Sequence, residues 1–384
     1  MMSVPVYPLA TTTWDEREYA ALQRVISSGR FTNGPVVREF EAAFADHFGA
    51  GFAVIVNLGS SANLIAVVAA VLDPRFDLQR GNEVLVPAVS WPTTYYPLTQ
   101  YGLRPVFVDV DVETLNVDLL EAAITHRRKA IFTVNLLGNP NDLRRLTWIA
   151  QDHSLVLLED NCESLGAVHD GVYVGTAGLA GTFSSFFSRH IATMEGGVIL
   201  TDDEQLYREM ISLPSHGWTR ELPVSNHVHN KTGDAGDDLF RFMLPGYNVR
   251  PLEMEGALGL EQLHSSWFGF SMVLKGALAG RRSEVVNAPT AAGIESRSIL
   301  VGNFTRNPVM AHLDAIIPDE RPAADNIHVD GVFIGNHHYP VHRRHRPRRR
   351  HYSSHMRALS AGTTSVSDRT CAGPCREETS EWPA

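Results

Sequence analysis

The feature that most constrains the fold of this chain is a regular alternation between short apolar runs and segments whose apolar residues recur at helical spacing. Seven such runs precede residue 202, at 52–56, 84–86, 106–108, 131–134, 155–158, 182–187 and 197–201. Alternation of this kind is typical of a parallel sheet wrapped by helices. The sequence therefore predicts an α/β fold built on a large, mostly parallel, seven-stranded sheet.

The pattern changes after Leu263, which suggests a second unit. Residues 267–274 read as a strand and residues 281–292 as a helix, with Pro289 late in it. We expect a large domain over 1–263 and a smaller, shortened C-terminal α/β domain over 264–340. From 341 to 384 the chain is rich in Arg, His and Ser and has almost no periodic apolar residues, a composition typical of a disordered or aberrant tail.

Charge and cysteine content exclude several classes of protein. The net charge is −10, although the tail from residue 341 holds nine Arg against four acidic residues. No basic stripe crosses the rest of the chain, so we expect no nucleic-acid partner. Three cysteines, two of them in the tail, exclude a disulfide scaffold and a four-thiolate site, and we expect no metal. No secretion signal or run of roughly eighteen apolar residues occurs, which favours a cytoplasmic protein without a membrane span.

Two features lie just beyond predicted strands, where parallel sheets gather their ligands. Gly59, Ser60 and Ser61 separate a strand from a helix expected to start near Ala62, which places backbone N–H groups and hydroxyls at a helix N-terminus. Such a turn can bind an anion, although similar turns are common without one. Asp160 ends another run, and a buried carboxylate there would be costly without a positive partner. A protonated ring nitrogen would serve, and a helix-capping role is the alternative.

Two longer segments resemble the DegT/StrS family of sugar aminotransferases and dehydratases, which have the aspartate-aminotransferase fold (fold type I of the pyridoxal-phosphate enzymes). They are TFSSFFSRHIATMEGG at 182–197 and EDNCESLGA at 159–167. Further matching stretches are SHGWTR at 215–220, PGYNVR at 245–250, GNFTRNP at 302–308 and GNHHYP at 335–340. The resemblance runs from the N-terminus to about residue 340 and implies a homodimer.

One position departs from the aminotransferase pattern. Members of the family normally carry a lysine five residues after a phosphate-binding serine, and this chain has His190 there. Only an amine can form the Schiff base that tethers pyridoxal phosphate, and the three lysines of the chain lie outside all the matching stretches. The resemblance therefore points to the dehydratase branch of the family. Such an enzyme uses pyridoxamine phosphate and glutamate to remove the hydroxyl at carbon 3 of a nucleotide-linked 4-keto-6-deoxy sugar, with a GDP-mannose derivative preferred.

The resemblance also assigns the site residues. His190 would be the catalytic base, and an unperturbed pKa of about 6.5 suits an imidazole to accept a proton and return it. The expected cofactor contacts are Gly59, Ser60 and Ser185 at the phosphate, Trp91 against the ring, Asp160 at the ring nitrogen and Glu163 at the ring hydroxyl. Trp91 taken by itself reads better as a core residue.

Four further residues lie in the matching stretches after residue 214. Asn248, together with Arg250, would reach across from a second subunit to complete the phosphate site. His216 and Arg220 are tentative substrate or cofactor contacts. An arginine in a polar loop is more often simply solvated.

Three alternatives stand beside this interpretation. An iron–sulfur dehydratase shares the histidine, but three cysteines do not supply a cluster. A sugar aminotransferase of the same fold would need an amine that the site motifs lack. A non-catalytic, degenerate family member is suggested by two departures: the long helical connection expected between Leu263 and Trp267 is missing, and residues 342–346 stand in place of the closing helix.

Overall fold

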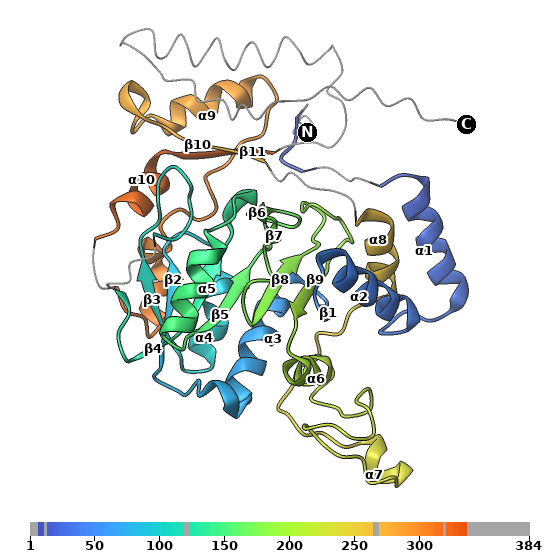
Figure 1. Ribbon diagram of the computed structural model, residues 1–384. Helices are drawn as coiled ribbons and strands as arrows, with labels where there is room; N and C mark the ends of the chain where they lie inside the picture. The colour runs from blue at the N-terminus through green and yellow to red at the C-terminus, as the bar shows by residue number, and fades with distance from the viewer. Residues whose placement is uncertain (1–6, 11–13, 119–122, 264–268, 318–319, 336–384) are drawn as a thin grey trace.

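The computed structural model describes residues 7–10, 14–118, 123–263, 269–317 and 320–335. Its centre is a seven-stranded sheet in the order β1-β9-β8-β5-β4-β2-β3 (Figure 1). The strands are β1 (Phe52–Val56), β2 (Glu83–Pro87), β3 (Arg104–Val108), β4 (Arg128–Val134), β5 (Val156–Asp160), β8 (Ala180–Ser184) and β9 (Gly197–Thr201). All neighbours are parallel except β9, which runs antiparallel to both β1 and β8. The prediction of seven mostly parallel strands is confirmed.

Strand β8 is shorter than the run that predicted it, because the chain leaves the sheet after Ser184. Ser185 N donates to Gly196 O (2.9 Å), and Thr193 N donates to Ser185 O (2.8 Å). These bonds close a loop over residues 185–196, which we call the β8–β9 loop. It contains His190.

Helices cover both faces of the sheet. They are α1 (Glu16–Ser28), α2 (Pro35–Phe48), α3 (Gly59–Leu72), α4 (Tyr96–Gln100), α5 (Leu143–Asp152), α6 (Glu204–Ser212) and α8 (Glu253–Gln262). Strand side chains alternate between two cores, as shown by Val54 beside α3 and Ile55 beside α2. The strands are therefore apolar on both faces, as buried parallel sheets usually are. Helices α1, α2 and α8 pack together next to β1 (Figure 1).

Short elements fill the connections between these helices and strands. They are η1 (Pro74–Phe76), η2 (Pro92–Thr94), η4 (Leu136–Gly138), β6 (Val168–His169), β7 (Val172–Tyr173), α7 (Ala235–Leu239), η5 (Gly276–Leu278), η6 (Phe304–Arg306) and η7 (Pro308–His312). Helix α7 belongs to an arm, residues 214–250, whose middle projects from the body (Figure 1), while Leu244, Tyr247 and Val249 pack against the main core. Trp218 stacks on Phe240 and Phe242 in this arm, with ring centroids 6.0 and 5.8 Å apart. Among the described helices, none has the length and apolar character needed to cross a bilayer.

The C-terminal part contains β10 (Gly269–Val273), α9 (Arg282–Ala291), α10 (Pro322–Asp330) and β11 (Gly331–Gly335), with β10 and β11 paired antiparallel. The strand and the helix predicted over 267–274 and 281–292 are thus present. Phe304 enters the main core, where its ring lies 4.4 Å from that of Tyr95. The division at 263/264 stays a prediction, and the predicted connection at 264–268 and tail at 341–384 lie outside the described residues.

Candidate active site

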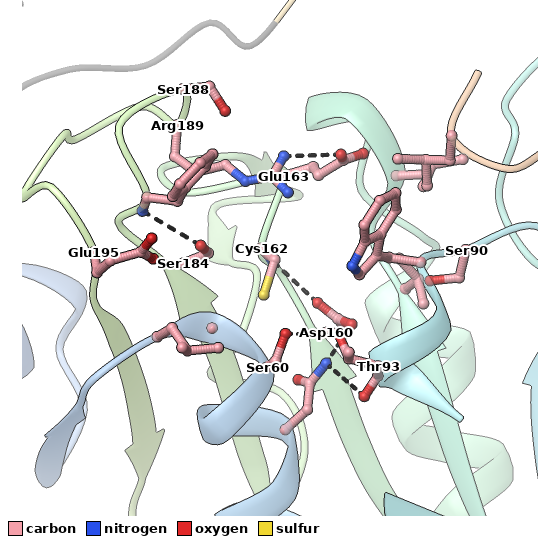
Figure 2. A pocket seen from close by; sticks show the side chains of 18 of the residues that line it. Ser60, Ser90, Thr93, Asp160, Cys162, Glu163, Ser184, Ser188, Arg189 and Glu195 are labelled. Carbon is pink, nitrogen blue, oxygen red and sulfur yellow. Dashed lines mark hydrogen bonds and ion pairs between the residues drawn. The ribbon is translucent and has the colours of Figure 1, made fainter. Parts of the chain in front are cut away.

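A cavity of about 270 Å³ lies at the carboxyl edge of the sheet (Figure 2). Its wall comes from the start of α3, from the segments after β2, β4, β5 and β8, and from two residues of the C-terminal part, Arg297 and Leu300. Of the predicted site residues, Gly59, Ser60, Trp91, Asp160 and Glu163 line it. The carboxyl edge is where open α/β sheets bind their ligands, so the location agrees with the topology.

The start of α3 forms one side of this cavity. The helix begins at Gly59, three residues before the expected start near Ala62, and Leu58 provides no side-chain cap. A Cβ added to Gly59 would lie 2.6 Å from Ser184 Cβ and 3.0 Å from Cys162 Sγ, so no larger residue fits without a shift. Ser60 Oγ donates to Thr93 Oγ1 at 3.0 Å, and both hydroxyls line the cavity. An uncapped helix start with adjacent hydroxyls is suited to a phosphate group.

Asp160 is the buried carboxylate of the cavity, with 4% of its surface exposed. Asn63 Nδ2 and Thr94 Oγ1 donate to its Oδ2 at 2.8 and 2.7 Å, and the backbone N–H of Cys162 donates to its Oδ1 at 3.1 Å. Three elements thus hold the carboxylate in place. No Lys, Arg or His of the described chain forms an ion pair with Asp160, so its charge is available to a cationic ligand group.

Glu163 forms a buried ion pair with Arg189. Arg189 Nη1 lies 2.8 Å from Glu163 Oε1, and the two side chains are 16% and 6% exposed (Figure 2). Arg189 belongs to the β8–β9 loop and Glu163 follows β5. The pair therefore ties the loop that carries His190 to the centre of the sheet.

His190 lies next to the cavity but is not part of its wall. Only 5% of its surface is exposed, and its chain neighbours Ser188 and Arg189 line the cavity instead. Burial, reinforced by the positive charge of Arg189, lowers the pKa of His190 to about 3. The imidazole is therefore neutral near pH 7.

Ser185 also lies behind the cavity wall. It is 1% exposed, and its hydroxyl accepts a hydrogen bond from Thr193 Oγ1 at 2.6 Å. The serine that lines the cavity is Ser184. The predicted phosphate contact of Ser185 stays a prediction.

The residues expected from the arm lie away from the cavity. Asn248 accepts a hydrogen bond from Arg250 Nη2 at 3.0 Å in an exposed position. Arg220 lies over the ring of Trp218 at 4.1 Å, and His216 is exposed. None of these four residues lines the cavity of its own chain. Their predicted roles therefore require that they contribute to the site of a second subunit.

Sequence reasoning missed several residues of the site. Asn63 and Thr94 hold Asp160, and Arg189 and Arg297 bring two positive charges into the cavity wall. A signal for Asn63 existed, because it is the only amide inside the otherwise apolar helix α3. Nothing in the local sequence marked Arg297, which reaches the cavity only through the packing of the C-terminal part.

The three lysines of the chain all lie elsewhere. Lys129 pairs with Asp77 at 3.4 Å, Lys231 Nζ donates to Arg220 O at 3.0 Å, and Lys275 pairs with Glu113 at 3.6 Å. None of them lines the cavity. Within the described ranges, no group of three or more His, Cys, Asp or Glu side chains is placed to hold a metal ion.

The residues present fit pyridoxal or pyridoxamine phosphate. The start of α3 offers N–H groups and hydroxyls for a phosphate, Trp91 offers an aromatic face, and Asp160 offers a fixed carboxylate for a protonated ring nitrogen. These three features occupy one cavity and have complementary chemistry. No lysine in the cavity could tether the cofactor.

Comparisons with known proteins agree with this site. GDP-4-keto-6-deoxy-D-mannose 3-dehydratase of Yersinia pseudotuberculosis is 47% identical over 369 residues, which cover 86% of this chain and 94% of the relative. The same enzyme of Escherichia coli, solved with bound hydrated pyridoxal phosphate, superposes with a TM-score of 0.85 at 45% identity, covering 88% of this chain and 97% of that one. A structure of GDP-4-keto-6-deoxymannose-3-dehydratase with a trapped PLP–glutamate geminal diamine gives a TM-score of 0.87 at 44% identity, covering 90% and 100%.

The family match covers most of the predicted large domain. The model of the DegT/DnrJ/EryC1/StrS aminotransferase family matches residues 12–265, which include the start of α3, Asp160, Glu163 and the β8–β9 loop. This match and the relatives confirm the resemblance read from the sequence and the expected fold. The chain therefore belongs to the DegT/DnrJ/EryC1/StrS aminotransferase family.

Proposed function

We propose that this chain is a pyridoxamine-phosphate-dependent dehydratase that removes the hydroxyl at carbon 3 of a nucleotide-linked 4-keto-6-deoxyhexose. Its amino donor is glutamate, and its preferred substrate is GDP-4-keto-6-deoxy-D-mannose. Relatives with this activity align with the chain over nearly their whole length. The reaction belongs to the synthesis of dideoxysugars, such as those of lipopolysaccharides.

The observation that carries the proposal is a cavity whose lining residues fit the cofactor but include no lysine. Aminotransferases of this family need a lysine at that position. Histidine occupies that position in the β8–β9 loop. Imidazole cannot form a Schiff base, but it can move protons. Elimination of a hydroxyl requires proton transfer and no covalent tether, so the residue present suits elimination better than amine transfer.

Different residues of the cavity would contact different parts of the cofactor. When bound, pyridoxamine phosphate supplies an amine for the keto carbon of the sugar and a ring that accepts electrons. Asp160 would pair with the protonated ring nitrogen, and its three hydrogen bonds hold the carboxylate in a fixed orientation. Trp91 would hold the ring flat, Gly59, Ser60 and Ser185 would bind the phosphate, and Glu163 would contact the ring hydroxyl.

His190 would transfer the proton. Its neutral imidazole can accept a proton from the reacting carbon, and the imidazolium so formed can pass that proton to the hydroxide leaving carbon 3. Because the imidazole lies behind the cavity wall, this role requires the His190 side chain to turn toward the bound ligands. The β8–β9 loop would have to allow that turn.

We also propose a homodimer in which Asn248 and Arg250 complete the phosphate site of the partner. Their position outside the cavity of their own chain supports the proposal. His216 and Arg220 lie on the same arm and would contact substrate or cofactor from there. The cytoplasmic location expected from the sequence stays a prediction, which cell fractionation would test.

The test is to incubate the protein with pyridoxal phosphate, glutamate and GDP-4-keto-6-deoxymannose and to measure products by mass spectrometry. We expect loss of the carbon 3 oxygen with release of ammonia. His190→Asn should abolish this loss while the variant still binds pyridoxal phosphate, as measured by absorbance titration. An amino sugar as product would identify an aminotransferase, and retained dehydration by His190→Asn would remove the proposed role of the imidazole.

A further inference from the structure

The carboxylate of Glu163 has two oxygen atoms with different surroundings. Arg189 Nη1 lies 2.8 Å from Oε1, in the ion pair that ties the β8–β9 loop to the segment after β5 (Figure 2). Oε2 is buried, and no residue of the described ranges donates a hydrogen bond to it. A buried polar atom without a partner is costly. Because Glu163 lines the cavity, we expect the partner of Oε2 to be a group of a bound ligand.

The other polar groups of the described cavity wall do not supply this partner. Besides the ion pair, the titratable residues of the wall are Asp160, Cys162, Glu195 and Arg297. Arg297 Nε and Glu163 Oε2 are both without a hydrogen-bond partner in the described chain, so they do not bond to each other. Burial raises the pKa of Cys162, which leaves a neutral thiol, a weak donor. A donor for Oε2 must therefore enter with a ligand.

An ionised carboxylate can only accept hydrogen bonds, so Oε2 requires a donor. In the proposed function, the ligand group beside Glu163 is the hydroxyl of the cofactor ring. That oxygen can donate only while it keeps its proton. An ionised ring oxygen would place a second negative charge against a buried carboxylate and leave both oxygens without a donor. The surroundings of Glu163 therefore favour the protonated form of the ring hydroxyl.

Arg189 affects which of the two oxygens keeps the proton. The proton could instead pass to Glu163, which would give a carboxylic acid beside an ionised ring oxygen. A guanidinium against Oε1 opposes that transfer, because it stabilises the carboxylate and does not give up its own proton. The backbone fixes the position of this cation, since Arg189 N donates to Phe186 O at 2.7 Å in a turn of the β8–β9 loop.

We propose that Arg189 is a positioning residue: through its ion pair with Glu163, it keeps the ring hydroxyl of the bound cofactor protonated. The inference rests on the proposed function for the identity of the cofactor. It also suits the proposed chemistry, because an ionised oxygen donates electrons into the ring and makes the ring a weaker electron acceptor. A protonated hydroxyl leaves the ring better able to accept electrons when an imidazole removes the proton.

The test is the near-ultraviolet spectrum of protein loaded with pyridoxamine phosphate. The absorption band of this cofactor moves to longer wavelength when its ring hydroxyl ionises, as it does in free solution near pH 7. We expect the short-wavelength band in the wild type. Glu163→Gln and Arg189→Gln should each change the ratio of the two forms roughly tenfold or more toward the ionised form, about one pH unit in a spectral titration. Arg189→Lys keeps the cation and should keep the short-wavelength band.

Arg297→Gln is the matched control for loss of charge. It removes a cation from the same cavity wall and leaves the pair between Arg189 and Glu163 in place. The short-wavelength band should remain. A shift as large as that of Arg189→Gln would attribute the effect to the total charge of the cavity and overturn the positioning role. If Arg189→Gln does not fold, as judged by thermal unfolding, Glu163→Gln and Arg189→Lys carry the comparison.

Kinetics give a second readout. With protein preloaded with pyridoxamine phosphate, Glu163→Gln and Arg189→Gln should lower kcat for GDP-4-keto-6-deoxymannose, while KM stays within about twofold. A long-wavelength band in the wild type, or an unchanged band in Arg189→Gln, would overturn the inference. Absence of dehydration with the spectral shifts intact would refute the proposed function and leave the role of Arg189 standing.

Discussion

Arg189 and His190 are consecutive residues with opposite relations to the cavity: the arginine lines it and the histidine lies behind it. The cation of Arg189 is one of the two causes that lower the pKa of His190, after burial. The ion pair with Glu163 holds that cation within the site. Arg189 is therefore placed to keep the imidazole neutral and able to accept a proton.

This arrangement predicts a pH effect. In Arg189→Gln, loss of the positive charge raises the pKa of the imidazole. Since the neutral form is the base, the acid-side fall in kcat/KM should move to higher pH. Arg189→Lys keeps the charge and should keep the wild-type profile. The measurement is the pH dependence of dehydration, and an unshifted acid limb in Arg189→Gln would contradict this role.

Sequence reasoning reached some residues of the site and missed others for a physical reason. Asp160 is the last residue of β5, and Gly59 and Trp91 come shortly after β1 and β2, so the topology alone places them at the carboxyl edge. Asn63 reaches Asp160, and Arg297 reaches the cavity, from segments that are far apart in the chain, and contacts of that kind are visible only after packing. The position of Ser185 and His190 behind the cavity wall likewise depends on how the β8–β9 loop folds.

At the scale of elements, α8 supplies the N-terminal cap of α2. The buried Glu253 carboxylate accepts hydrogen bonds from the backbone N–H groups of Gly34, Val36 and Val37 at 2.6, 3.1 and 3.1 Å. An anion at a helix N-terminus is stabilised by the free N–H groups and by the helix dipole. This contact joins two helices that are more than two hundred residues apart.

Removing this cap should destabilise the protein. Glu253→Ala leaves buried N–H groups of α2 without an acceptor, and we expect a loss of about 2–3 kcal/mol in the free energy of unfolding. Glu261→Ala is the control, because Glu261 lies on the same helix in a partly exposed pair with Arg24 and should cost less than about 1 kcal/mol. Denaturant unfolding of both variants measures the difference. Equal losses would show that the cap does not stabilise α2.

The elements themselves were more predictable than their order. Apolar runs located all seven strands of the sheet because burial on both faces leaves a local signature. Strand β9 inserts between β1 and β8, and no local pattern encodes this position, because the pairing of β9 with β1 joins residues more than 140 positions apart. The start of α3 at Gly59 differs from the expected one because Gly59 and the two serines that follow adopt the first helical turn.

At the scale of the whole molecule, the proposed dimer can be tested by complementation. A chain with His190→Asn keeps Asn248, and a chain with Asn248→Asp keeps His190. If Asn248 completes the partner's site, a mixed dimer contains one site with both residues intact. Equal mixing should then restore about a quarter of wild-type activity from two inactive variants, because half of the dimers are mixed and each has one good site.

The control for this experiment uses two variants at the same position. Mixing His190→Asn with His190→Ala can restore no intact site and should give no activity. Light scattering establishes whether two chains associate. If His190→Asn and Asn248→Asp chains exchange subunits but regain no activity, the phosphate site is built from a single chain.

The surface location of Lys129, Lys231 and Lys275 has a consequence for how such a protein is handled and regulated. Without a covalent tether, occupancy by the cofactor follows mass action, so dilution or dialysis should empty the protein and added cofactor should refill it. The available concentration of vitamin B6 phosphates would then set the fraction of molecules ready to react.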